Sequence, residues 1–234
     1  MSFKRFLTGI VAPLATLLLL PGQPAAYPNP FLLYGSSIEF DVFREGEKVG
    51  SHTVQFTRNG QDLLVESSMG IAINVLFITV FRYEYRAVGR WQNRQLQNLV
   101  SRVDDNGKKY AIAAAREGNI INLTRADDTS IAVAAPVIPT NHWNPAVLNE
   151  TRVLNTLTGR INEVKIISRG LERVNTERGP VQAMRYAYTG ALQNEVWYDS
   201  AGRWVKLRFQ GRDGSTIEYV CRRCQGSSEA GQTN

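Results

Sequence analysis

Four side chains are candidates for chemistry, because the chain has only two cysteines and two histidines among its 234 residues. Cys221 and Cys224 flank a pair of arginines near the C-terminus. In an oxidising compartment two such cysteines most simply form a disulfide, and over so short a loop it would be an inert clasp. The arginines between them would also favour a thiolate, so redox exchange and metal binding stay open as alternatives.

The two histidines lie in different contexts. His52 shares the strand parity of Val54 and Phe56, so its side chain either points inward or lies at the rim of a sheet. His142 precedes Trp143, which we expect to anchor its loop on the sheet. No Gly-x-Ser-x-Gly, His-Glu-x-x-His or phosphate-binding motif accompanies them. We therefore predict no catalytic residue, no metal ligand and no cofactor, and keep both histidines and Trp143 as candidate functional polar residues.

The elements that must position these residues are strands. Apolar and polar residues alternate with a period of two over most of the chain, as in 38–42 and 52–56. Turn signals separate these runs, among them Asn59-Gly60 and Asp105-Asn106-Gly107. About twelve short strands with tight turns predict an all-β protein, whose antiparallel curved sheet is barrel-like or a half-barrel.

One short helix is expected within this sheet protein, over Asn144–Leu157. Pro145 suits a first helical position, Asn144 can cap it, and Gly159 would end it. The least regular stretch, Ala126–Asn144, is expected to be a crossing loop. No Pro-, Gly- or Ser-rich linker divides the chain, so we predict a single β-rich domain over 27–234, ordered from about 36 to 221 and ending in a polar tail.

The segment Met69–Phe81, MGIAINVLFITVF, is the most unusual part of the chain because it carries no charge. A core strand buried on both faces is the first interpretation. The second is an apolar lining for a lipid-like ligand, and the third is a loop that contacts a membrane. The candidate lining residues are Met69, Ile73, Val75, Phe77, Phe81 and Tyr83.

The N-terminal segment has the layout of a secretory signal peptide. Lys4 and Arg5 precede the apolar run Phe6–Leu20, and Ala25-Ala26 supply small residues for cleavage. A run of this length is short of the roughly 20 residues that a spanning helix needs. We predict a signal peptide over 1–26, export to the periplasm of a Gram-negative envelope, and no transmembrane span after cleavage.

Charge gives no indication of nucleic-acid binding. The chain has 27 Lys and Arg residues against 21 Asp and Glu residues, which leaves +6, and these charges form no basic stripe. A weak attraction to anionic lipid headgroups is the remaining use of this surplus.

Four motifs resemble those of domain-of-unknown-function family 6134, whose members are exported bacterial proteins. They are the segments 40–52, 140–144, 157–159 and 196–203, and the resemblance spans roughly Ser36 to Tyr219. It implies a secreted, antiparallel β-rich domain and implies no activity. The cysteine pair is outside the motifs that carry the resemblance.

These observations predict an exported periplasmic protein that binds an apolar, lipid-like molecule or a partner protein of the envelope, and is not an enzyme. The alternative is a thiol-redox or metal-binding envelope protein that uses Cys221 and Cys224.

Overall fold

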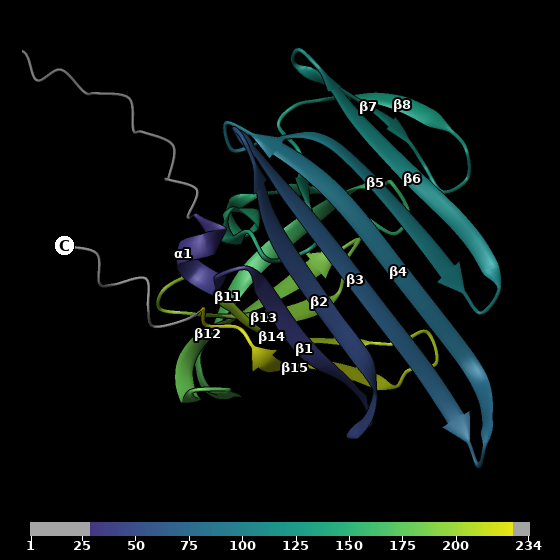
Figure 1. Ribbon diagram of the computed structural model, residues 1–234, viewed down its shortest axis with the longest axis vertical. Helices are drawn as coiled ribbons and strands as arrows, with labels where there is room; N and C mark the ends of the chain where they lie inside the picture. The colour runs from purple at the N-terminus through teal and green to yellow at the C-terminus, as the bar shows by residue number, and fades with distance from the viewer. Residues whose placement is uncertain (1–28, 227–234) are drawn as a thin grey trace, which may run out of the picture.

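The computed structural model describes residues 29–226, which form one large curved sheet that does not close (Figure 1). The predicted signal peptide and the end of the polar tail, beyond residue 226, lie outside the described residues. Within the described range the sheet has fifteen strands in the order β8-β7-β6-β5-β4-β3-β2-β1-β15-β14-β13-β12-β11-β10-β9. The all-β, barrel-like prediction is therefore confirmed.

Two short helices accompany the sheet, the α-helix α1 (Pro30–Tyr34) and the 3-10 helix η1 (Pro145–Asn149). The strands are β1 (Ser37–Arg44), β2 (Glu47–Asn59), β3 (Asp62–Val75), β4 (Ile78–Gln92), β5 (Gln95–Asp105), β6 (Lys108–Glu117), β7 (Ile120–Thr124), β8 (Ser130–Ala134), β9 (Ile138–Pro139), β10 (Arg152–Leu154), β11 (Ile161–Thr176), β12 (Gly179–Gly190), β13 (Asn194–Asp199), β14 (Trp204–Gln210) and β15 (Thr216–Arg223).

The topology is two meanders joined through their ends. Strands β1–β8 pair in chain order and so do β10–β15, and β1 pairs antiparallel with β15 through contacts such as Phe40 opposite Cys221. Figure 1 shows the purple-to-teal strands as one wall and the green-to-yellow strands as a second wall. Only β9 and β10 run parallel among the described strands. The first and last strands in chain order, β1 and β15, therefore lie side by side in the interior of the sheet.

The core lies on the concave side of this sheet. Alternate residues of each strand point into it, for example Ile38, Phe40 and Val42 of β1, which are wholly buried. Trp143 and Trp204 are the largest buried side chains near the centre. Period-two alternation is thus explained by one face packed on the core and one face in water.

The hairpins form where turn residues indicate them. Gly60, with a φ of 59°, and Gln61 form the turn between β2 and β3, directly after Asn59, and Asn106 and Gly107 between β5 and β6 have φ angles of 53° and 92°. Positive φ at both central residues is the requirement of a type I′ hairpin turn, which Asn106 and Gly107 meet at low cost.

The prediction of a helix over Asn144–Leu157 is wrong beyond the first turn of that helix. Asn144 accepts a hydrogen bond from the backbone N–H of Ala146, but the 3-10 helix ends at Asn149. Val153 and Leu154 then lie wholly buried in β10, which pairs with β9 on one side and β11 on the other. Backbone pairing on both sides outweighs a helix whose apolar face had only three residues. The expected crossing loop before it contains β8 and β9.

The interpretation of the whole segment Met69–Phe81 as a buried core strand is also wrong. Val75 ends β3, Leu76 and Phe77 form a turn, and Ile78 begins β4. Leu76, Phe77, Ile78 and Val80 are exposed by 88%, 102%, 69% and 51%. The register explains this: β2 accompanies β3 only as far as Ile71, and β5 accompanies β4 only from Tyr83, so residues 72–82 project as a two-stranded ribbon with no neighbour to cover it.

Among residues 29–226, no helix has the length and apolar character needed to cross a bilayer.

Candidate functional site

An interior cavity of about 640 Å³ lies inside the curved sheet. One wall comes from β2, β3 and β4, the opposite wall comes from β14 and β15, and three loops and a turn contribute further lining residues. The loops are 140–142, 155–157 and 192–193, and the turn is 211–215, between β14 and β15. The cavity therefore lies where the two meanders face one another.

The walls of the cavity are mostly apolar. Of the lining residues expected from the sequence, Met69, Ile73, Phe81 and Tyr83 line this cavity. Phe77 does not, because it lies at the end of the projecting ribbon, and the side chain of Val75 is outside the described part of the structure. The apolar wall residues that sequence reasoning missed are Val49, Ile71, Tyr85, Leu157, Leu192, Trp204, Leu207, Phe209, Ile217 and Tyr219.

Two of the missed residues had a signal in the sequence, and one of them is Tyr85, which shares the strand parity of Phe81 and Tyr83. Ile71 shares the strand parity of Met69 and Ile73, so the alternation alone places it on the same face. Leu207, Phe209, Ile217 and Tyr219 lie far away in the chain, and the pairing of β1 with β15 brings them opposite β3 and β4.

Polar side chains gather at one end of the cavity, which we call the inner polar end and define by His52, Asn141, His142 and Asn194. His52, Asn141 and His142 are 6%, 8% and 5% exposed. Both ring nitrogens of His52, Nδ1 of His142, and Oδ1 of Asn141 and of Asn194 are buried and have no hydrogen-bond partner among the described residues. Each such buried polar atom costs about 1–3 kcal/mol unless it finds a partner.

Aromatic contacts hold the two histidines in place. His52 lies in the middle of β2 and points inward, with its ring centroid 5.2 Å from that of Tyr219 and 5.7 Å from that of Trp204. His142 has a positive φ of 54°, and its carbonyl accepts a hydrogen bond from the Tyr198 hydroxyl at 2.7 Å. Its Nε2 lies 3.5 Å from Nδ2 of Asn194.

Both histidines are neutral at physiological pH. Burial lowers the pKa of His52 to about 3, with a further contribution from the charge of His142, and burial lowers the pKa of His142 to about 4. A neutral imidazole carries one N–H donor and one acceptor nitrogen. The inner polar end therefore presents uncharged donors and acceptors to the cavity.

Charged groups lie at the other end of the cavity, at the turns after β1, β5 and β14. Arg212 forms an ion pair with Asp105 at 2.7 Å, and Arg44 pairs with Asp213 at 2.6 Å. We call these four residues the mouth, because Arg212 is largely exposed. Hydrogen bonds from Ser215 and Arg44 hold the pKa of the Asp213 carboxyl below its ordinary value. The charges at the mouth thus compensate one another.

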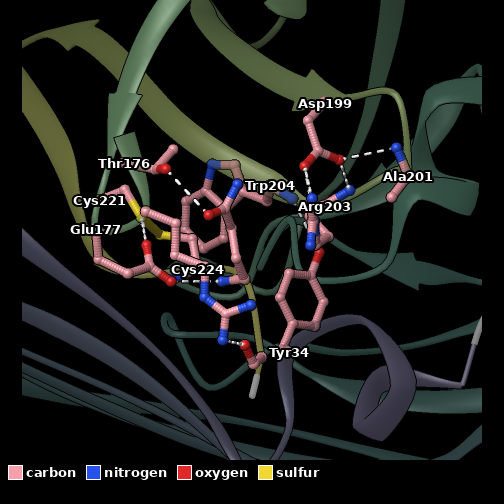
Figure 2. Close-up of polar contacts among 12 residues, drawn as sticks. Tyr34, Thr176, Glu177, Asp199, Ala201, Arg203, Trp204, Cys221 and Cys224 are labelled. Atoms are coloured by element: carbon pink, nitrogen blue, oxygen red, sulfur yellow. Dashed lines mark hydrogen bonds and ion pairs between the residues drawn. A yellow bond between two sulfur atoms is a disulfide. The ribbon is translucent and has the colours of Figure 1, made fainter. Parts of the chain in front are cut away.

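Trp143 lies in the core beside the cavity rather than in its wall. Its carbonyl accepts a hydrogen bond from the Tyr34 hydroxyl at 3.1 Å, and that hydroxyl accepts the backbone N–H of Trp204 at 2.9 Å. Figure 2 shows Tyr34 reaching from α1 to the start of β14. Through these contacts Tyr34 and Trp143 anchor the loop that carries His142.

The two cysteines form a disulfide at the end of β15 (Figure 2). Glu177, in the turn between β11 and β12, accepts the backbone N–H groups of Cys224 and Gln225 at 3.0 and 2.9 Å. Its second carboxylate oxygen lies 3.0 Å from Sγ of Cys221. The predicted disulfide is confirmed, and together with Glu177 it fastens the end of β15 to that turn.

A metal would require this disulfide to open. The ligand atoms of Glu177, Cys221 and Cys224 lie within 4.8 Å of one another, but a metal ligand is a thiolate and both sulfurs are bonded to each other here. The disulfide is also separate from the cavity, since neither cysteine lines it.

Comparison with known proteins places the chain in a family. Residues 40–222 match the family model described as "Domain of unknown function (DUF6134)". The chain belongs to this family. The match covers β1 through β15, and so includes the whole cavity of this DUF6134 domain.

A solved structure shares the fold. The chain is similar to a beta-barrel-like protein of domain of unknown function DUF1849 from Brucella abortus, with a TM-score of 0.58 and 9% sequence identity over 82% of this chain and 97% of the other. At this identity the likeness shows the fold alone. No curated protein matches the chain.

Proposed function

We propose that this DUF6134 protein binds an elongated small molecule with an apolar body and a neutral polar head, and that it is a binding protein rather than an enzyme. The observation that carries the proposal is the interior cavity, whose walls are mostly apolar and whose inner polar end holds buried polar atoms without partners among residues 29–226.

The size and lining of the cavity suit a small molecule. Ligand cavities usually have volumes of about 300–1,000 Å³ and are lined by apolar side chains with a few polar groups that orient the ligand. A volume of about 640 Å³ lies within that range. Each methylene group that leaves water contributes about 0.8 kcal/mol, so the walls favour an aliphatic or isoprenoid body. A cavity of this volume holds such a molecule more readily than a segment of a partner protein.

The inner polar end favours a head without charge. Neutral histidines and amides can donate to and accept from a hydroxyl, ester or amide group. No ionised side chain lines the cavity at that end, because its charged lining residues are the four paired groups of the mouth. Burying an isolated carboxylate or ammonium group there would be costly.

Export to the periplasm is part of the proposal. Its support is the signal-like layout of residues 1–26 together with the disulfide, since disulfides persist in oxidising compartments and are rare in the cytosol.

A fluorescent probe tests the cavity. N-phenyl-1-naphthylamine should bind saturably with enhanced emission, and 1-monooleoylglycerol should displace it better than oleate does. Ile71→Glu places a carboxylate on the cavity wall and should weaken probe binding at least about tenfold, since an unpaired charge would be buried.

Ala72→Glu is the matched control. Ala72 is the next residue of β3 and is exposed on the opposite face, so the same change there should leave probe binding unaltered. Absence of saturable binding, or equal loss in the two variants, contradicts the proposal. Stronger displacement by oleate contradicts the neutral head.

Thiol–disulfide exchange is the second candidate, and the carboxylate of Glu177 beside the Cys221 sulfur favours it, because a nearby carboxylate can take up a proton from a thiol. The burial of both sulfurs, with Cys224 at 0% exposure, opposes it, because an attacking thiolate needs access. An insulin-reduction assay on the protein and on its Cys224→Ser variant separates the two: equal, background rates dispose of the redox function.

A further inference from the structure

The end of the β3–β4 hairpin carries the largest exposed apolar cluster described in the structure. We call it the hairpin tip and define it by Leu76, Phe77, Ile78 and Val80. It ends the ribbon of residues 72–82, which extends past its neighbours at the lower right of Figure 1. Exposed apolar clusters of this kind mark surfaces that contact a partner or a membrane.

The two polar side chains nearest the tip pair with each other. The hydroxyl of Thr79 donates to Oδ1 of Asn74 at 2.8 Å, and the two strands pair through to Val75 opposite Ile78. The outer edges of the ribbon have no neighbouring strand, so their backbone groups need water or lipid headgroups as partners. Insertion is therefore shallow and is confined to the apolar side chains at the end of the hairpin.

The apolar surface of the tip continues into the cavity. Ile73 and Phe81 pair across the ribbon on the inner side of the Asn74–Thr79 pair, and both line the cavity. Ile71 and Tyr83 follow as the next pair, and they line it too. A chain of apolar side chains therefore connects the outermost point of the hairpin with the interior.

Charge at this end of the sheet is balanced. The neighbouring segments 44–48, 82–84, 104–109 and 211–215 hold six Lys and Arg residues and six Asp and Glu residues. The main force available here is therefore the burial of apolar side chains, and not attraction to anionic headgroups.

A lipid surface fits the tip better than a second copy of the chain. Four side chains offer a patch of a few hundred Å², whereas a stable protein interface buries about 800 Å² on each partner. Insertion into lipid requires no complementary partner surface, and each buried apolar side chain contributes about 1.5–3 kcal/mol.

We propose that the hairpin tip inserts into a phospholipid bilayer surface and docks the protein with its cavity facing the membrane. This goes beyond binding of a ligand in the cavity, and it concerns a different set of side chains. A docked tip would let an apolar molecule pass between bilayer and cavity along Ile73 and Phe81.

A label at the tip tests this locally in the full chain. Ile78→Cys supplies one reactive thiol, because Cys221 and Cys224 are disulfide-bonded, and it is labelled with the environment-sensitive dye NBD. With phosphatidylcholine vesicles we expect a blue shift and at least a twofold rise in emission, and quenching by spin-labelled lipid. Asn119→Cys, in the turn between β6 and β7 at the opposite end of the sheet, should show neither. Absence of a response at position 78, or an equal response at position 119, overturns the proposal.

Vesicle flotation of unlabelled protein tests the contribution of the side chains. The double variant Leu76→Asn/Phe77→Ser should partition onto the same vesicles at least about tenfold less than the parent chain. Asn tolerates the positive φ of 57° at residue 76, and both side chains are exposed, so the fold should be retained. Binding should persist in 0.5 M NaCl and on vesicles without anionic lipid.

These experiments distinguish a lipid surface from a second copy of the chain as the partner of the hairpin tip. Partitioning that the double variant leaves unchanged, or that salt abolishes, overturns insertion of the tip. Concentration-dependent self-association that the double variant abolishes, without a vesicle response at position 78, assigns the tip to a second copy and overturns the proposal as well. None of these measurements requires a ligand in the cavity, so their failure and the failure of the ligand-binding proposal are independent.

Discussion

His52 of β2 and His142 of the loop between β9 and η1 lie close enough that the charge of His142 contributes to the lowered pKa of His52. Ninety residues of sequence separate them, yet both line the same end of one cavity. Two buried, neutral histidines in one site make the stability of the protein sensitive to acid.

Stability should therefore fall on acidification below the ordinary histidine pKa. The folded pKa values, about 3 and about 4, lie below the unfolded value near 6.5. Below about pH 6.5 the unfolded chain binds protons that the folded chain does not, so the free energy of unfolding decreases as pH falls. Each histidine should account for a loss of about 2 kcal/mol at pH 5. Urea unfolding at pH 7 and pH 5 measures this.

His52→Phe is the variant that isolates one of the two groups. Phe fits among Phe40, Trp204 and Tyr219 without a titrating nitrogen. The dependence of the unfolding free energy on pH between 6.5 and 5 should drop by about half. An unchanged dependence would show that the carboxyl groups, and not the histidines, set the acid sensitivity.

Binding of a ligand with a neutral head should depend on the amides of the inner polar end. Asn194→Ala removes an amide whose oxygen has no partner in the described part of the chain and whose nitrogen lies beside His142. We expect the affinity for 1-monooleoylglycerol to fall about tenfold, the usual effect of losing one hydrogen bond to a ligand. Asn122→Ala, an exposed amide on β7, is the control and should leave the affinity unchanged. Equal affinities of the two variants would show that the polar head of the ligand does not bind at the inner polar end.

Removal of two different buried tyrosine hydroxyls should affect the stability of the protein differently. Tyr34→Phe deletes the hydroxyl that joins Trp143 to Trp204 and leaves the buried N–H of Trp204 without it, so the free energy of unfolding should drop by about 2 kcal/mol. Tyr188→Phe deletes a buried hydroxyl with no partner among the described residues, so stability should stay the same or rise. Denaturant melts of both variants measure the contrast, and a similar loss in both would refute this account of Tyr34.

The disulfide should contribute modestly to stability and not to the cavity. Replacing both cysteines by serine removes a loop closed over a separation of three residues, which corresponds to about 2 kcal/mol in the chain-entropy account. Binding of N-phenyl-1-naphthylamine should be unchanged in this variant. A loss of probe binding without a loss of fold would show that the clasp shapes the cavity.

Glu177→Gln tests the contribution of the Glu177 contacts next to the disulfide. An amide oxygen can still accept the N–H of Cys224. The free energy of unfolding should change by less than about 1 kcal/mol in this variant and more in Glu177→Ala.

Local features of the chain were predictable because their causes are local. Gly60 and the pair Asn106-Gly107 form hairpin turns because these residues accept positive φ. Alternation along β1 and β2 indicates which side chains point inward, so the all-β class and the inward direction of Val54 and Phe56 follow from the residues alone.

Exposure and pairing with distant strands were not predictable. The apolar residues of the hairpin tip look like core residues in sequence, and they are exposed because β2 and β5 stop short of them. Val153 and Leu154 fit a helix as well as a strand, and β9 and β11 decide between the two. Such outcomes depend on the lengths and registers of neighbouring elements.

The residues by themselves determined a sheet of hairpins, a disulfide pair and an uncharged apolar segment, because turn chemistry and side-chain alternation act between near neighbours. Only the tertiary structure decided that Tyr219 faces Met69, that His52 meets His142, and that the apolar segment divides into a cavity wall and an exposed tip. The physical reason is the pairing of β1 with β15, which brings the two meanders together and encloses a space that no single stretch of chain specifies.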